Sequence, residues 1–299
     1  MKNNKAVAYG LLVLTFFVWG SIYVASKYAM GSLPPVAIAG GRYAIAAAAL
    51  LPFYLKSGQR VQREDIKYLF LIGGVGYFAS MTANALGIKL AGASTASLIN
   101  SLNPVAISAM AAWILREKIQ PKTVLCLGLS VAGALIITRG TAAGGELGIV
   151  FSSLSVLLWA VASVIMRRLG SKYNAVTVTF LSALVSLVFY VPAGAADILM
   201  NRGWISLAPG AVAAVVYMGL FGTGLGGALW AKCLSMLEAG TCSLFYPLQV
   251  IFSAVLGALF LQEQFTSAFF AGAVCICCSI LMQCLPVEKP VVKMGTKKK

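Results

Sequence analysis

Residues 97–117 read SLINSLNPVAISAMAAWILRE, and residues 243–263 read SLFYPLQVIFSAVLGALFLQE. Both stretches begin with Ser-Leu, continue through an apolar run with amides and one proline, and end in Leu-x-Glu. Each apolar run is close to the ~20 residues that a helix needs to cross a bilayer. The two stretches lie 146 residues apart, which indicates a membrane-spanning unit that occurs twice in the chain.

The composition of the whole chain agrees with a membrane protein. Of its 299 residues, 60% are hydrophobic and 10% are charged, whereas about 25% of a soluble domain is charged. This balance excludes a large soluble domain, a nucleic-acid-binding module and a secreted disulfide scaffold. The seven cysteines lie mostly in apolar runs and the chain has no histidine, so we predict no metal site and no cofactor.

Charged residues, glycines and prolines divide the chain into ten apolar segments. Because lipid offers no partners to backbone amides, each segment is predicted to be a helix. The predicted spans are 6–28, 34–55, 66–87, 92–115, 121–138, 146–166, 174–197, 209–233, 239–262 and 266–286.

The distribution of basic residues predicts the orientation. With the N-terminus in the cytoplasm, 18 of the 23 Lys and Arg residues fall on the cytoplasmic side, four fall outside, and Arg42 lies within a span. Positive charge favours the cytoplasmic face. We therefore expect a multi-pass protein of the cytoplasmic (inner) membrane with both termini in the cytoplasm, in contact with membrane lipids.

The two halves of the chain align over most of their length. Trp19 and Trp159 lie 140 residues apart, as do Pro52 and Pro192, and after an insertion near 201–209 the offset becomes 146. Each half holds five spans, so the second half enters the membrane upside down. Inverted repeats of this kind are typical of transporters that work by alternating access.

The repeated motifs resemble those of a known family. The pattern Leu-x-Glu at residues 115–117 and 261–263, the lead-in Ala-x-x-x-Ser-Leu from Ala93 and from Ala239, and the dipeptides at 103–104 and 246–247 are similar to the EamA repeat of the drug/metabolite transporter superfamily. One departure is that Pro247 aligns with Ser101 rather than with Pro104.

The resemblance implies an all-α membrane protein of ten transmembrane helices, arranged as two inverted five-helix EamA repeats around a central cavity. The repeats would cover 6–139 and 146–286, followed by a basic cytoplasmic tail at 287–299. Helices three, four, eight and nine would border the cavity. The fifth and tenth would support packing, or the contact of a homodimer.

Polar and aromatic side chains inside the spans are the candidates for substrate binding, because polar groups in a membrane are costly unless they pair or face water. For each of them helix packing is the alternative interpretation. Arg42, about 12 Å deep at 1.5 Å per residue, either clamps a substrate carboxylate or snorkels outward to a structural partner. The predicted substrate-binding residues are Trp19, Tyr23, Arg42, Tyr77, Asn84, Ser97, Asn100, Asn103, Trp159, Trp230, Tyr246 and Gln249.

Glycines in spans three and eight, among them Gly73, Gly76, Gly219 and Gly222, indicate close helix packing, with a flexible gate as the alternative.

All eight acidic residues fall at span ends or in connections, which disfavours proton-coupled export of cations through a buried carboxylate. We expect no catalytic residues. The leading hypothesis is an exporter of small amphipathic metabolites, such as amino acids, that runs downhill or by exchange. The alternatives are an uptake carrier for a nutrient or cofactor in the same fold and, from other classes, a lipid-active membrane enzyme or a receptor.

Overall fold

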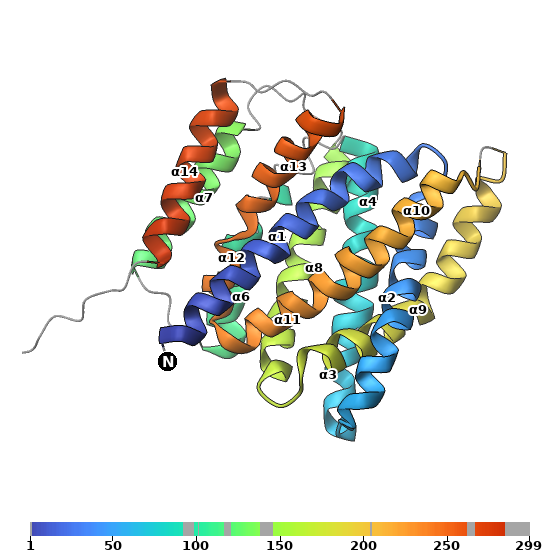
Figure 1. The fold of residues 1–299 in the computed structure, drawn as a ribbon, viewed down its shortest axis with the longest axis horizontal. Helices are drawn as coiled ribbons and strands as arrows, with labels where there is room; N and C mark the ends of the chain where they lie inside the picture. Colours follow the sequence, from blue (N-terminus) through green and yellow to red (C-terminus); the bar gives the residue numbers. More distant parts are fainter. Residues whose placement is uncertain are drawn as a thin grey trace, which may run out of the picture.

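The computed structural model describes residues 2–91, 99–100, 102–116, 121–137, 146–203, 205–261 and 267–284, and the regular structure within these ranges is helical throughout (Figure 1). The protein is an all-α membrane protein, as predicted. Among the described residues, six helices are long and apolar enough to cross a bilayer: Lys5–Met30, Pro35–Ser57, Arg63–Gly87, Glu146–Gly170, Ala175–Met200 and Pro209–Met236.

The first half of the chain supplies the elements of the first five predicted spans. They are α1 (Lys2–Met30), α2 (Pro35–Ser57), η1 (Arg63–Asp65), α3 (Ile66–Phe70), η2 (Leu71–Ser80), α4 (Met81–Ala91), α6 (Asn103–Leu115) and α7 (Pro121–Ile137). The third span is continuous from α3 through η2 to α4, and the predicted start of the fourth span, 92–98, lies outside the described residues.

The second half repeats this order. Its elements are α8 (Glu146–Gly170), α9 (Ala175–Met200), α10 (Pro209–Tyr217), η3 (Met218–Leu225), α11 (Gly226–Met236), α12 (Ala239–Ser243), α13 (Tyr246–Leu261) and α14 (Ser267–Cys284). The predicted cytoplasmic tail, 287–299, lies outside the described part of the chain.

Local sequence explains where the second and seventh spans begin and end. Pro35 occupies the first turn of α2, where its missing N–H has no partner to lose. Gly58 ends the same helix in the left-handed conformation with φ 60°, and its N–H donates to the carbonyl of Leu55, because glycine adopts this conformation without a Cβ clash. Asn174 caps α9 by accepting from the N–H of Thr177 at 2.7 Å.

The third and eighth spans both change from α-helix to π-helix partway along. The π segments are η2 and η3, and subtracting the 146-residue offset from η3 places it at 72–79, inside η2. Well under 1% of residues in proteins are π-helical, and such segments frequently mark functional sites. The internal duplication therefore extends to an unusual backbone feature that residue pairs alone do not predict.

Glycines of these segments bring the two halves into contact. A Cβ at Gly73 would lie 2.7 Å from the Cβ of Val185, and a Cβ at Gly219 would lie 2.7 Å from the Cβ of Ile45. Val185 is the equivalent of Ile45 at the 140-residue offset. The third span of each half thus packs against the second span of the other half, and only glycine leaves room for it.

The third span of each half also packs against the first span of the other half. A Cβ at Gly76 would clash with the Cβ of Ala162, and a Cβ at Gly222 would clash with the Cδ1 of Ile22. Ile22 and Ala162 are again 140 residues apart. These contacts confirm the close packing predicted for the glycines and show that the two inverted halves interlock.

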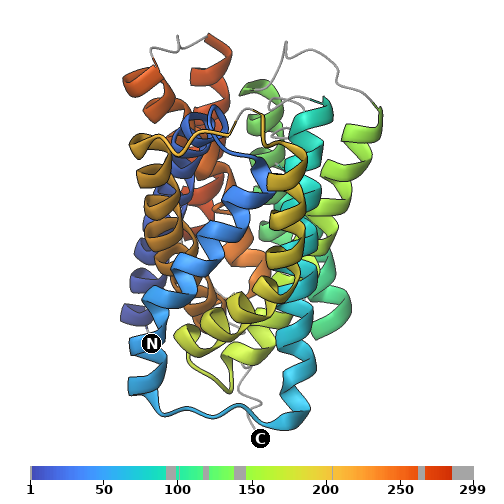
Figure 2. The same cartoon turned by 90° about the vertical axis from the view of Figure 1, so that its right-hand side faces the viewer.

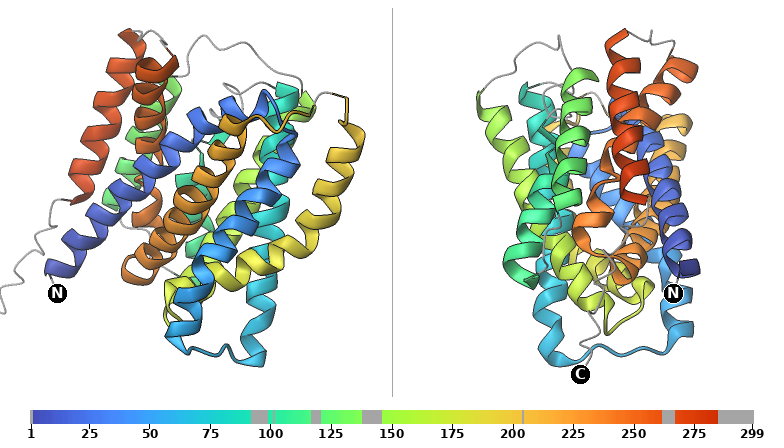
Figure 3. Two further views of the ribbon diagram at one scale, coloured as in Figure 1. Left: turned by 45° about the vertical axis from the view of Figure 1, so that its right-hand side comes forward. Right: turned by 90° about the vertical axis from the view of Figure 1, so that its left-hand side faces the viewer.

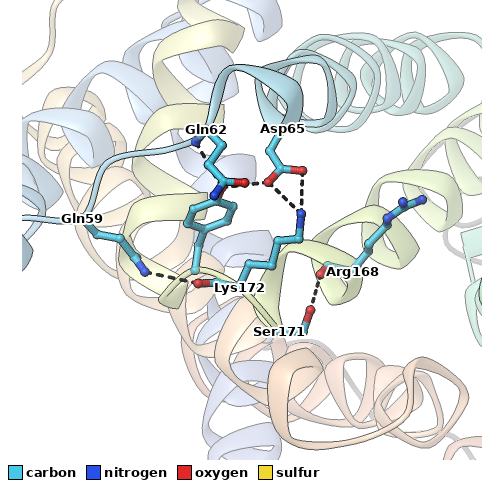
Figure 4. Close-up of polar contacts among 7 residues, drawn as sticks. Gln59, Gln62, Asp65, Arg168, Ser171 and Lys172 are labelled. Atoms are coloured by element: carbon cyan, nitrogen blue, oxygen red, sulfur yellow. Dashed lines mark hydrogen bonds and ion pairs between the residues drawn. The ribbon is translucent and has the colours of Figure 1, made fainter.

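Polar clusters join the halves at the two ends of α2. At the Ser57 end, the connection 58–62 leads from α2 to η1 (Figure 2). There the carboxylate of Asp65 accepts from the Tyr173 hydroxyl at 2.8 Å and from the Lys172 ammonium at 3.0 Å (Figure 4). At the Pro35 end, Asp197 accepts from the backbone N–H of Val36 at 2.9 Å. The first cluster joins the connection between α8 and α9 to η1 at the start of the third span, whereas the second joins the first turn of α2 to the last turn of α9.

We expect the Asp65 cluster to weaken in acid. The hydroxyl of Tyr173 and, next, the ammonium of Lys172 lower the pKa of the Asp65 carboxyl. A carboxyl whose pKa is lowered by folding stabilises the folded state at pH values above its usual pKa of about 3.9. This stabilisation is lost as the pH falls through the lowered pKa. Asp65→Asn should therefore lower the midpoint of thermal unfolding at pH 7 and reduce its dependence on pH below 4. Glu64→Gln, at an exposed neighbour, is the control. An unchanged acid response in Asp65→Asn would contradict this account.

Helices α7 and α14, the fifth and tenth spans, pack along each other at one side of the bundle (Figure 3). The hydroxyl of Ser279 donates to the carbonyl of Cys126 at 2.7 Å in their buried contact. The pair also contacts α13, and none of its described residues lines the central cavity.

Candidate functional site

A cavity of about 150 Å³ lies between the two halves. One water needs ~10–15 Å³ on the same measure, so the cavity has room for a small organic molecule. The first, second, third, fourth, sixth, eighth and ninth spans all contribute to its wall. The lining residues are Trp19, Ile22, Arg42, Tyr43, Tyr77, Met81, Asn84, Asn100, Asn103, Ser155, Trp159, Gly222, Thr223, Gly227, Trp230, Tyr246 and Gln249.

The structure brings ten of the twelve predicted site residues together in this wall. They are Trp19, Arg42, Tyr77, Asn84, Asn100, Asn103, Trp159, Trp230, Tyr246 and Gln249. Tyr23 lies on α1, but its side chain, like the whole of Ser97, falls outside the described part of the chain.

Aromatic rings form one wall of the cavity. The ring of Trp19 lies 6.1 Å from that of Trp159 and 5.7 Å from that of Trp230, between centroids. Trp159 stacks on Tyr77 at 6.3 Å with an interplanar angle of 24°. Edge-to-face and offset arrangements of this kind hold the rings rigidly, so the wall is preorganised for an apolar or cationic group.

The two tryptophans related by the duplication differ in their hydrogen bonds. The indole N–H of Trp19 donates to the carbonyl of Gly222, within η3, at 3.0 Å. Among the described residues, the buried indole N–H groups of Trp159 and Trp230 have no acceptor. Because a buried donor without a partner is costly, these two groups are available to an acceptor on a molecule in the cavity.

Asparagines form the polar end of the lining. The side-chain nitrogen of Asn100 donates to the amide oxygen of Asn84 at 2.7 Å, and the side-chain nitrogen of Asn103 donates to the backbone carbonyl of Asn100 at 2.9 Å. The first bond joins the third and fourth spans, and the second lies within the fourth. The amide oxygen of Asn103 is buried and has no donor among the described residues, so it can accept from a bound molecule.

Arg42 is the one charged residue in the described cavity lining. Its Nε donates to the hydroxyl of Thr223 at 3.2 Å, which links α2 of the first half to η3 of the second. No carboxylate of the described residues is in the lining. The guanidinium thus leaves the cavity with a net positive charge and with further N–H donors.

The lining residues that sequence reasoning missed are mostly those that carry no polar signal. The exceptions are Tyr43, Ser155 and Thr223, which carry hydroxyls. Of these, Thr223 lies 146 residues after Tyr77, so the internal alignment could have identified it. Ile22 and Met81 resemble any other apolar residue of a span. Tyr43 faces inward in a stack with Tyr77 and Tyr190, at centroid distances of 5.0 and 5.4 Å.

Known proteins with a similar sequence are named as transporters. The chain is 28% identical over 263 residues to an uncharacterized transporter of Archaeoglobus fulgidus, covering 88% of this chain and 93% of the relative. It is 26% identical to the uncharacterized transporter YcxC of Bacillus subtilis, covering 99% and 98%. A protein of Rickettsia bellii named as an S-adenosylmethionine uptake transporter is 22% identical, covering 92% of each chain.

The fold also occurs among solved structures. One crystal structure superposes with a TM-score of 0.79 at 18% sequence identity, covering 93% of this chain and 96% of the other. The sequence model of the EamA-like transporter family matches twice, at residues 6–139 and 146–284, which together span most of the chain. The protein therefore belongs to the EamA-like transporter family.

Proposed function

We propose that this protein moves small amphipathic metabolites, amino acids or related compounds, across the cytoplasmic membrane as an exporter. The observation that carries the proposal is the cavity between the halves, where one guanidinium without a carboxylate partner in the described lining faces an aromatic wall. Substrate sites at the interface of inverted repeats are typical of secondary transporters.

The lining suits a zwitterion better than a simple cation. A carboxylate can bind the guanidinium of Arg42 in the bidentate manner that arginine favours. The faces of Trp159 and Trp230 can accept an ammonium or stack on an apolar side chain. The amide oxygen of Asn103 then supplies an acceptor for a substrate N–H.

Alternating access is supported by how the halves meet. The interlocking glycines place the π segments of both halves beside the cavity, and polar clusters join the halves at both ends of α2. Rocking of one half against the other around the cavity would separate one cluster at a time. We propose repeats at 6–139 and 146–286, and cytoplasmic termini.

The cavity favours transport that is not coupled to protons. No described residue of the lining is an acid, and the chain has no histidine, so a group that exchanges a proton for substrate near neutral pH is missing from the described wall. We therefore propose downhill export or exchange.

Uptake of S-adenosylmethionine is a second candidate function. It is favoured by the name of the Rickettsia bellii relative and by the aromatic wall, because a sulfonium, like an ammonium, is attracted to aromatic faces.

Counterflow in proteoliposomes distinguishes the two functions. Proteoliposomes that contain the purified protein and are loaded with unlabelled amino acids should accumulate radiolabelled amino acids. Collapse of a proton gradient should leave the rate of this accumulation unchanged. Accumulation of labelled S-adenosylmethionine alone would favour the second function. Strict dependence on a proton gradient would contradict the uncoupled mechanism.

Asn103→Leu and Trp159→Ala should each reduce flux. Loss of one hydrogen bond to a charged substrate group removes about 1.5–3 kcal/mol, which corresponds to about a 10- to 100-fold weaker apparent affinity. Initial rates over a range of substrate concentrations measure the effect, and gel filtration shows that the protein remains folded. Val105→Leu, at a lipid-exposed position on the same helix as Asn103, is the control. Normal kinetics in both variants would remove these residues from the site.

A further inference from the structure

A second hollow lies on the outside of the bundle, between the third span and α9, which run side by side (Figure 2). It has a volume of about 1070 Å³. Its apolar wall is formed by Phe70, Val75 and Phe78 of the third span and by Phe189 of α9. Phe70 and Phe189 are 49% and 38% exposed, so the groove opens sideways toward lipid.

Gly74 lies at the bottom of this groove and has no side chain that would fill it. A Cβ at Gly74 would lie 3.2 Å from the ring of Phe189, and that ring stacks on Phe78 at a centroid distance of 5.4 Å. The small residue therefore leaves a channel beside the stacked rings in which a flexible apolar chain can lie.

The length of the groove matches one leaflet of a bilayer. From Lys67 to Ala79 the third span rises by at most about 18 Å, the value for 1.5 Å per residue, because the π-helical η2 within it is more tightly wound along its axis than an α-helix. Half of the ~30 Å hydrocarbon core is about 15 Å. A groove of this length, with charged residues at one end only, has the proportions of a lipid that extends from headgroup to chain end.

The charged end of the groove is basic. Arg63 and Lys67 line it and are exposed, and no described acidic residue forms an ion pair with either. Nearby, the guanidinium of Arg168 lies 4.8 Å from the centroid of the Tyr68 ring, and the Lys67 ammonium lies 5.2 Å from it. Of the neighbouring acids, Asp65 is already paired with Lys172, so the single exposed carboxylate beside the groove is that of Glu64.

We propose that this groove binds one anionic phospholipid, with its phosphate on Arg63 and Lys67 and an acyl chain along Phe70, Val75 and Phe189. Basic residues at a membrane surface attract anionic headgroups. A protein segment fits less well, because the groove runs at the depth of the hydrocarbon core, where an extended backbone would lack hydrogen-bond partners. The same π segment presents Tyr77 to the cavity, so a bound lipid contacts the helix that also forms the cavity wall.

Native mass spectrometry of the full chain in detergent tests this assignment. Dioleoyl phosphatidylglycerol and dioleoyl phosphatidylcholine are added in equal amounts, and the fraction of protein with one lipid bound is measured for each. Wild type should retain phosphatidylglycerol about 25-fold better than phosphatidylcholine, since each of the two basic residues near the surface contributes about a fivefold preference. The double variant Arg63→Gln/Lys67→Gln should retain the two lipids equally.

Two further variants separate the groove from general surface charge. Lys56→Gln/Arg60→Gln removes the same charge just before the groove in the sequence, from the last turn of α2 and the connection 58–62, neither of which lines the groove, and should keep the preference. Val75→Phe fills the groove with both cations present and should lower retention of phosphatidylglycerol severalfold. Equal retention of both lipids by wild type, or equal loss of preference in both double variants, would overturn the proposal. Displacement of the lipid by millimolar glycerol phosphate would likewise overturn it in favour of a site for free phosphate compounds.

Discussion

Replacing Arg42 with glutamine should weaken the transport of carboxylate-bearing substrates by about 10- to 100-fold in apparent affinity, because a hydrogen bond to a charged group contributes about 1.5–3 kcal/mol. Arg42 is the one charge in the described cavity lining, so the described wall holds no second cation to replace it. Arg42→Lys should recover part of the loss, since lysine keeps the charge but lacks the planar fork.

The readout that separates binding from folding is a comparison of an amino acid with its amide, which lacks the negative charge. Wild type should prefer the acid, and Arg42→Gln should transport both at similar rates. Thr223→Val removes the hydroxyl that accepts from Arg42 at 3.2 Å and should have a smaller effect, because the charge remains. An unchanged preference for the acid in Arg42→Gln would show that the guanidinium has only a structural role, which is the other interpretation that the sequence allows.

Gly76→Ala should destabilise the protein by about 1–3 kcal/mol and abolish most flux, because overpacking a tight contact costs this much. The new methyl group would clash with the Cβ of Ala162, which cannot rotate away. In an exposed helix the same change would instead stabilise by up to about 1 kcal/mol. Thermal unfolding in detergent, read beside flux in proteoliposomes, measures both effects.

Two further variants test whether the clash with Ala162 causes the loss of stability. Ala162→Gly in the Gly76→Ala background removes the clashing atom and should restore stability, whereas Gly10→Ala, where nothing lies within 4 Å, should be neutral or stabilising. The equivalent change in the second half, Gly222→Ala, meets the flexible end of Ile22 and should cost less. A variant Gly76→Ala as stable as wild type would contradict the interlocked packing.

Most of the lining of the candidate site was predictable because polar and aromatic residues are conspicuous within apolar spans. Asn84, Asn103 and Trp159 could be selected without coordinates, since a polar group in lipid requires a partner or a cavity. Ser155 and Thr223 were missed because small hydroxyl residues also serve ordinary helix packing. Ile22 and Met81 have no chemical feature that distinguishes them from lipid-facing residues.

By itself, the sequence determined the membrane class, the approximate limits of the spans and the inverted duplication. These properties depend on hydrophobic length and on the order of residues along the chain. Each span must by itself be long and apolar enough to cross the bilayer as a helix. Only the tertiary structure decided which apolar residues of each span turn inward, because lipid provides no contrast between one apolar side chain and another. The paired π segments, the Arg42–Thr223 hydrogen bond and the groove along the third span all arise from that choice of faces, which the packing of one half against the other determines.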